Sequence, residues 1–174
     1  MTEYATKNIT INQGSTWDSN FFIMIDPEGS LVDFTGKNFK MQVRSTTSNK
    51  SAILELTDTN GKIVVDTGTL IGAWAVGTAY SVDDIVTYSI TQLGTSFSVY
   101  FICAIANTGE TPSLTSTYWS VFKQVNFKLS ATVTKSLPIG AYVYDLEVID
   151  NTVSPYVEQK LLSGSFTINA EATR

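Results

Sequence analysis

The chain contains no histidine and a single cysteine, Cys103, among its 174 residues. Without histidine, a Ser-His-Asp or Cys-His catalytic arrangement cannot be built, and histidine-ligated metal sites are excluded. One cysteine cannot form an intrachain disulfide, and its apolar setting, FICAIA, indicates a small buried residue rather than a nucleophile. The sequence also has no Walker A loop and no G-x-G-x-x-G motif. We therefore expect no enzymatic activity, no cofactor and no metal ion.

Charged residues are scarce, at 16% of the chain, and the basic ones form no run or stripe. The formal net charge of −5 opposes binding to a nucleic-acid backbone or to an anionic membrane surface. No stretch approaches the roughly 20 apolar residues that a membrane span requires. The first residues, MTEYATKNITINQ, lack the apolar core and basic start of a signal peptide. We expect a protein made in a cytoplasm, with no nucleic-acid partner and no membrane insertion.

Apolar and polar residues alternate along much of the chain, which is the period of a strand with one buried face. In NFKMQVRS (38–45) and AYVYDLEVID (141–150) the apolar side chains fall on every second position. The turn signals are DPEG at 26–29 and Asn60-Gly61, which predicts a hairpin. At most one helical turn is expected, at 130–137. The segments expected as strands are 9–12, 21–25, 38–45, 52–57, 62–66, 126–133, 141–150 and 156–169.

These short strands predict an all-β fold, an antiparallel immunoglobulin-like β-sandwich. The composition changes near Leu70, because residues 72–122 contain no Lys or Arg but many aromatic side chains. We therefore predict a discontinuous sandwich domain, 1–71 and 123–174, with a small three-stranded β domain inserted at 72–122. Such insertions are tolerated because loop closure costs little more as a loop lengthens.

Two sets of carboxylates are candidates for a catalytic or metal-binding role. Asp83 and Asp84 would point to opposite faces of an extended chain, and the sequence brings Glu110 near neither, so a glycosidase pair is not supported. Asp145 and Glu147, two positions apart, project from one strand face. They form either a metal or acid–base pair or a solvated face with Arg44 as an ion-pair partner, and we favour the solvated face.

The outer segments carry ITINQGSTWDSNFFIMIDPEGSLVDFTGKNFKMQVRS near the start, then LPIGAYVYDLEVID and VEQKLLSGSFTINAEATR near the end. In this order they resemble the β-sandwich of tailed-phage virion proteins, as in the N-terminal domain of baseplate upper proteins. The resemblance covers about 120 residues. It implies a virion structural protein that binds other virion proteins and copies of itself.

The inserted segment carries Trp74, Tyr80, an Asp-Ile-Val step after Asp83 and a further tyrosine, Tyr88, followed by VYFICAIANTGETPS and YWSVF. This pattern resembles small carbohydrate-binding modules of the chitin-binding type. The resemblance implies a compact module that binds sugars by aromatic stacking, with no catalytic group. It departs from the pattern at Asp83, where Gly is common, and in CAIANTGETPS, where an exposed aromatic pair is common.

The candidate ligand-binding residues, for a host-surface glycan or a partner protein, are Tyr100, Tyr118, Trp119, Trp74 and Tyr80. Of these, Trp74, Tyr80 and Trp119 match positions that mainly build the small core of such modules. Tyr100 and Tyr118 are expected to be the more exposed rings.

Three functions remain open. The chain is a tail or baseplate component whose insert is exposed for host-glycan contact, an assembly or decoration element of head, neck or capsid surface without a ligand, or a free carbohydrate-binding protein. We favour the first.

Overall fold

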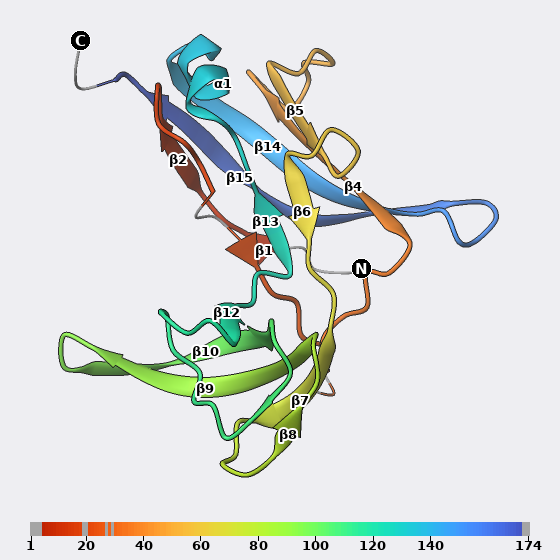
Figure 1. Ribbon diagram of the computed structural model, residues 1–174. Helices are drawn as coiled ribbons and strands as arrows, with labels where there is room; N and C mark the ends of the chain where they lie inside the picture. Colours follow the sequence, from red (N-terminus) through yellow and green to blue (C-terminus); the bar gives the residue numbers. More distant parts are fainter. Residues whose placement is uncertain (1–4, 19–20, 27, 29, 172–174) are drawn as a thin grey trace. The chain divides into compact units, whose positions relative to one another are not determined.

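A computed structural model describes residues 5–18, 21–26, 28 and 30–171 (Figure 1). Strands make up 52% of the chain and helix 4%, which confirms the predicted all-β class. The chain forms two compact units. The first comprises Met1–Phe21, Phe34–Val65 and Val125–Arg174, and the second Phe22–Asp33 and Asp66–Gln124.

The described residues form mostly short strands and one helix, which lies in the last chain segment of the first unit. In chain order they are β1 (Ala5–Thr6), β2 (Ile9–Asn12), β3 (Phe21–Phe22), β4 (Lys37–Arg44), β5 (Leu54–Thr57), β6 (Ile63–Val65), β7 (Thr69–Ala73), β8 (Ala79–Tyr80), β9 (Asp84–Gln92), β10 (Thr95–Cys103), β11 (Asn107–Thr108), β12 (Trp119–Val121), β13 (Val125–Phe127), α1 (Ala131–Ser136), β14 (Gly140–Asp150) and β15 (Val157–Asn169).

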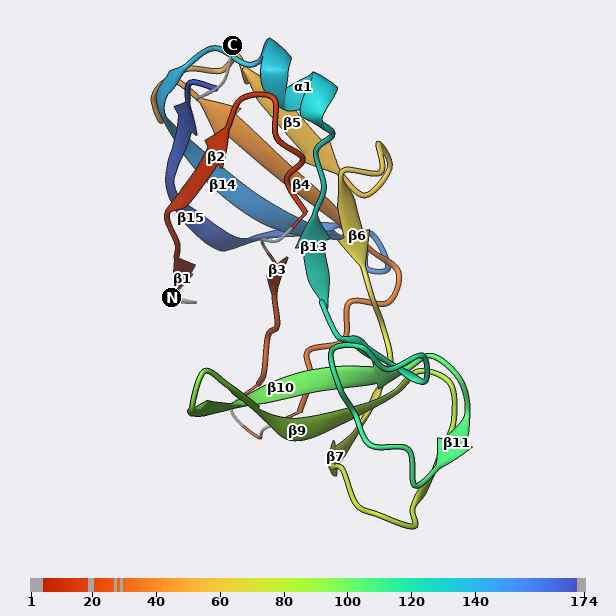
Figure 2. The ribbon, with the colours of Figure 1, turned by 60° about the vertical axis from the view of Figure 1, so that its left-hand side comes forward.

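The larger sheet of the first unit is built around the long strands β14 and β15 (Figure 2). Its order is β1-β15-β14-β4-β5, and β2 also pairs with β15. The pairs β15/β14, β14/β4 and β4/β5 are antiparallel, as predicted, whereas β1 and β2 run parallel to β15. The predicted alternation is confirmed on β4, where Phe39, Met41 and Val43 are buried.

A second, three-stranded sheet of order β3-β13-β6 completes the sandwich. Trp17 joins the two sheets, because its ring stacks on Phe127 of β13, with centroids 5.5 Å apart, and meets Phe166 of β15 edge-on at 5.7 Å. All three rings are at most 4% exposed. An apolar layer between two sheets is the core that the alternating strands require.

The predicted hairpin through Asn60-Gly61 is wrong, although the turn itself is present. Gly61 has a φ of 70°, and its N–H donates to Asp58 O at 3.1 Å. However, β5 pairs with β4 and β6 pairs with β13, so the turn carries the chain from one sheet to the other. The Asn60 side chain accounts for this geometry. Its Oδ1 accepts from the N–H groups of Thr57 (3.0 Å) and Lys62 (3.1 Å), which a hairpin would pair across strands.

Two predicted strands are shorter than expected. The apolar run 21–25 is a strand only at β3, and the run 126–133 ends at Phe127 and continues into α1. Ser130 caps α1 by accepting from Val133 N at 3.3 Å. Of the predicted turn at 26–29, Pro27 and Gly29 lie outside the described residues. No helix in the described part of the chain is long and apolar enough to span a membrane.

The second unit contains a four-stranded sheet, β12-β10-β9-β7, and a two-stranded sheet, β11-β8, where a three-stranded module was expected. Strands β9 and β10 form a long hairpin with register from Thr95↔Gln92 to Ile102↔Ile85. Its core cluster consists of Tyr80, Val86, Phe101, Cys103 and Trp119.

Residues 22–33, which the sequence placed with the sandwich, group with the second unit, and Gln124 of that unit binds two of their main-chain groups. The amide Nε2 of Gln124 donates to Val32 O, and its Oε1 accepts from Met24 N, both at 2.7 Å. Val32 N also donates to Met24 O at 3.0 Å. Gln124 is 4% exposed, so both the nitrogen and the oxygen of its buried amide have a hydrogen-bond partner in this clamp.

Candidate functional site

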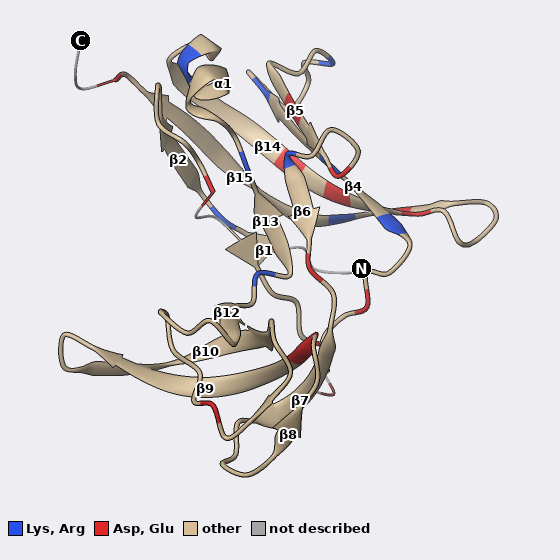
Figure 3. Ribbon diagram, in the orientation of Figure 1, with Lys and Arg blue, Asp and Glu red and all other residues tan. Residues whose placement is uncertain are grey.

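Charge is distributed unequally between the two units (Figure 3). The second unit holds one basic residue, Lys123, against seven acidic ones, whereas the first holds ten basic and nine acidic residues. No charged residue lies between Asp84 and Glu110, a stretch that includes nearly all of the β9–β10 hairpin. The surface of this hairpin therefore presents mainly hydroxyl groups and aromatic rings.

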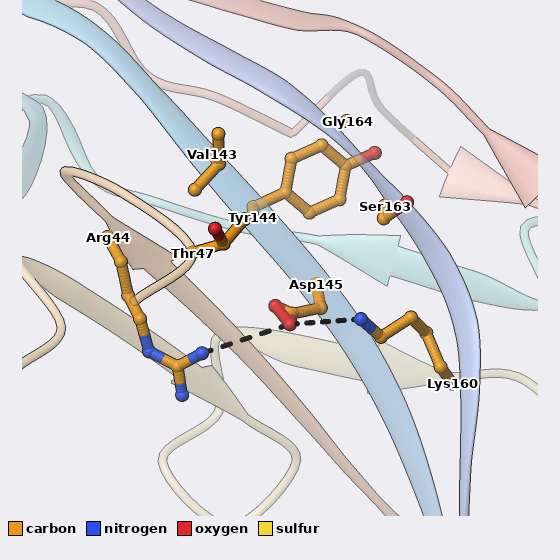
Figure 4. A pocket seen from close by; sticks show the side chains of 8 residues that line it. All are labelled: Arg44, Thr47, Val143, Tyr144, Asp145, Lys160, Ser163 and Gly164. Carbon is orange, nitrogen blue, oxygen red and sulfur yellow. Dashed lines mark ion pairs between the residues drawn. The ribbon is translucent and has the colours of Figure 1, made fainter. Parts of the chain in front are cut away.

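The sandwich carries a cavity of about 280 Å³ on the polar face of its larger sheet (Figure 4). Inside it, Asp145 Oδ2 lies 3.3 Å from Lys160 Nζ and 3.8 Å from Arg44 Nη1. Arg44 was expected to pair with one of the two carboxylates, Asp145 or Glu147, and it pairs with Asp145. The lining residues are Arg44, Thr47, Val143, Tyr144, Asp145, Lys160, Ser163 and Gly164.

A β-bulge places Lys160 on this polar face. Leu146 is opposite Leu162, but Glu147 is opposite Lys160, so Leu161 is an extra residue on β15. Leu161 and Leu162 are both 6% exposed, which buries two consecutive leucines and returns Lys160 to the side of the carboxylates.

The neighbouring charges on this face are paired as well. Lys40 Nζ lies 3.5 Å from Glu147 and 3.3 Å from Glu158. Burial alone lowers the pKa of Lys40, but the hydrogen bond to Glu158 and the charges of both glutamates outweigh it and raise the pKa. No group of His, Cys, Asp or Glu suited to a metal ion occurs within the described residues. The arrangement fits a solvated, ion-paired sheet face rather than an acid–base pair.

Two candidate residues, Tyr80 and Trp119, belong to the core of the second unit. Their rings meet edge-on at 5.2 Å, and they are 3% and 2% exposed. Trp119 Nε1 donates to Glu110 O at 2.7 Å, and the Tyr80 hydroxyl accepts from Ala75 N at 2.8 Å. Because ring faces and polar atoms are both occupied, these residues build the module and offer no face to a ligand.

Tyr100 and Tyr118, expected as the more exposed rings, are both only partly exposed. Tyr118 packs against the core cluster, and its carbonyl accepts from Ala104 N at 2.8 Å. Phe97, which the sequence did not single out, is 42% exposed.

Cys103 is 1% exposed, as its apolar setting predicted, and its Sγ donates to Ile105 O at 3.2 Å. Burial and the nearby charge of Asp84 raise the pKa of its thiol. A thiol that stays protonated is a poor nucleophile and metal ligand.

The remaining candidate, Trp74, lies at a groove of about 280 Å³. Trp74 N donates to Thr87 O at 2.9 Å, which ties the residue after β7 to β9, and its ring meets Tyr88 edge-on at 5.5 Å. Trp74 Nε1 is buried and has no hydrogen-bond acceptor among the described residues. We call this the Trp74 groove, and its lining residues are Ala73, Trp74, Thr87, Tyr88, Ser89 and Ser98.

The groove combines two aromatic rings with the hydroxyl groups of Thr87, Tyr88, Ser89 and Ser98, and none of its lining residues is charged. Ser89 and Ser98 are opposite each other in the β9–β10 register and are both exposed. The sequence missed them because serines are common at exposed strand positions and carry no signal of their own. Comparison of the chain with models of protein families, with curated proteins and with solved structures found no match.

Proposed function

We propose that this chain is a non-enzymatic structural protein of a tailed-phage virion, a tail or baseplate component, and that its second unit binds a neutral glycan in the Trp74 groove. The virion assignment rests on the sequence resemblance of the outer segments. The glycan assignment rests on one observation, the groove in which Trp74 and Tyr88 lie beside the hydroxyls of Thr87, Ser89 and Ser98.

The chemistry of the groove suits a sugar. An aromatic ring matches the C–H face of a pyranose, and hydroxyl groups orient the hydroxyls of the sugar by exchanging hydrogen bonds. The second unit has Lys123 as its single basic residue. A glycan bearing carboxylate or phosphate would find almost no cationic partner there, so the expected ligand is uncharged.

The test is a panel of immobilised neutral and acidic oligosaccharides, including β-linked N-acetylglucosamine oligomers, probed with the full chain. Ser89→Trp fills the groove without removing a core side chain, because Ser89 is exposed. Ser120→Trp is the matched control, since Ser120 is an exposed serine of the same sheet outside the groove. We expect binding to a neutral glycan that Ser89→Trp weakens at least about tenfold and Ser120→Trp leaves unchanged. Binding of acidic glycans alone, or no binding, would contradict the proposal.

Antibody labelling of intact particles, with serum against residues 72–122, tests the location. Label at the tail tip would support a host-facing role. Label on the head or neck would favour the alternative, an assembly or decoration protein without a glycan ligand.

A further inference from the structure

The long hairpin of the second unit has a free sheet edge. β12 covers β10 only at Phe101–Cys103, through the register Phe101↔Val121 to Cys103↔Trp119. Beyond this point Phe122 N donates to Tyr100 O at 2.8 Å. Toward the turn, at residues 95–99, β10 pairs with β9 on one side and, within the described part of the chain, with no strand on the other.

The outward peptide groups on this edge follow from the ladder. Peptide groups of alternate residues in an antiparallel strand face opposite neighbours. Because Tyr100 O faces outward to accept from Phe122, the main-chain groups of Ser98 and Ser96 face outward too. These two serines therefore present, on an extended strand, main-chain donors and acceptors that have no hydrogen-bond partner among the described residues.

Monomeric proteins protect such edges with charges, proline, bulges or covering groups. The sandwich of this chain does so at the edge strand β5, where Glu55 O accepts from Lys62 Nζ and Asn60 Nδ2, each at 3.3 Å. The segment 95–99, TSFSV, contains no charge and no proline. Its Thr, Phe and Val are strong strand formers, and Phe97 is 42% exposed. The segment therefore lacks the charges and proline that would prevent another strand from pairing with it.

We propose that the β10 edge, residues 95–99, pairs antiparallel with the same edge of a second copy of this chain. The segment is nearly symmetric about Phe97, with a serine on each side. A two-fold axis at Phe97 pairs Ser96 of each copy with Ser98 of the other copy, which gives two equivalent residue pairs. The four outward N–H groups then meet four carbonyls, and the two Phe97 rings lie opposite each other on one face.

The electrostatics favour this contact over others between copies. Each chain carries a net charge of −5, so most approaches of two copies bring like charges together. The stretch between Asp84 and Glu110 is uncharged, so the paired strands themselves bring no like charges together. An isologous contact of this kind closes as a dimer.

The pairing does not depend on the glycan proposal, because it uses the outward main-chain groups of Ser96 and Ser98, whereas Ser98 lines the Trp74 groove and is proposed to offer its hydroxyl there. The first test is amide hydrogen exchange of the full chain at low and high protein concentration. We expect the amides of Ser96 and Ser98 to become protected as concentration rises. The amides of Ser89 and Thr91, on the opposite edge of the hairpin, are internal controls and should exchange at an unchanged rate.

Sedimentation equilibrium of proline variants is the second test. Ser98→Pro removes an outward N–H and leaves the β9–β10 bonds intact, whereas Ser89→Pro, its register partner, does the same on the other edge. Ser98→Pro removes two of the four intermolecular bonds and should raise the dimer dissociation constant at least about tenfold. Ser89→Pro should leave it unchanged, and Phe97→Lys, which keeps the backbone, should also disrupt the dimer.

Three outcomes would overturn the proposal. They are a chain that stays monomeric at concentrations up to about 0.5 mM, a dimer sensitive to Ser89→Pro but not to Ser98→Pro, and a dimer sensitive to neither. Glycan binding lost in Ser89→Trp with the dimer intact would leave this inference standing, so the two proposals fail separately.

Discussion

Replacing Gln124 by methionine tests why the segment 22–33 belongs to the second unit. Methionine has a similar volume and fills the site without a cavity, but it has no amide. Met24 N and Val32 O, on two half-buried residues, then lose their partners at 2.7 Å beside a side chain that is 4% exposed. An unsatisfied buried polar group costs about 1–3 kcal/mol, so two such groups should cost about 2–6 kcal/mol of local stability, and the lower end fits half-buried residues.

Amide hydrogen exchange is the appropriate assay, because two units need not unfold together. The amide of Val32 donates to Met24 O and reports directly on the clamped segment. A loss of about 2 kcal/mol predicts an exchange rate roughly 30-fold faster in Gln124→Met. Gln159→Met is the control, since Gln159 is an exposed glutamine of β15. If the Val32 amide exchanged at the wild-type rate in Gln124→Met, the clamp would not hold the segment.

Three further predictions follow from single residues. Burial raises the pKa of Tyr144, so above pH 10 the folded state keeps a proton that the unfolded state releases. Above pH 10 the free energy of unfolding should therefore fall with pH about 1.4 kcal/mol per pH unit more steeply in wild type than in Tyr144→Phe. Equal slopes of the two proteins in alkaline denaturation would refute this. Leu93 has a φ of 50° at the hairpin turn, a conformation that asparagine adopts more easily than leucine. Leu93→Asn should therefore raise the free energy of unfolding, measured by urea denaturation, by about 1 kcal/mol. Leu114→Asn, at an exposed leucine, is the control and should leave it unchanged. The raised pKa and burial of Cys103 predict alkylation at pH 8 on the order of 100-fold slower than in denaturant, and equal rates would show an accessible thiol.

Local periodicity was sufficient to predict the parts of the fold that alternate. On β4 and β14 every second residue is apolar, and a half-buried strand follows from that pattern alone. The same pattern put Asp145 and Glu147 on the polar face, where Arg44 was expected to pair with one of them, and it pairs with Asp145. These are properties of neighbouring residues and need no knowledge of distant ones.

Pairing between distant segments was not predictable in the same way. Asn60-Gly61 signals a turn, but whether the next strand folds back or crosses to another sheet depends on β13, some sixty residues later. The clamp of 22–33 by Gln124 likewise joins residues far apart in the sequence. Nothing in the sequence around Gln124, VFKQVNFK, indicates the two main-chain groups that its amide binds.

The candidate site was predictable in part. The aromatic positions pointed to Trp74, but the core accounts for Tyr80 and Trp119, and the hydroxyls of Ser89 and Ser98 come together only through the register of β9 and β10. A strand register is set by turn geometry and by which faces are buried. The sequence contains the turn residues and the apolar pattern that set the register, but it does not show which serines become neighbours.

The most direct test of the glycan site uses the three tryptophans as internal reporters in an NMR titration of the full chain with a neutral oligosaccharide from the panel. Trp74 lines the groove, whereas Trp119 Nε1 is bonded to Glu110 O and Trp17 is stacked in the sandwich core. We predict that the indole N–H resonance of Trp74 shifts with ligand concentration while those of Trp119 and Trp17 stay in place. A saturable shift at Trp119 or Trp17 with none at Trp74, or no shift at any indole, would contradict the assignment of the groove.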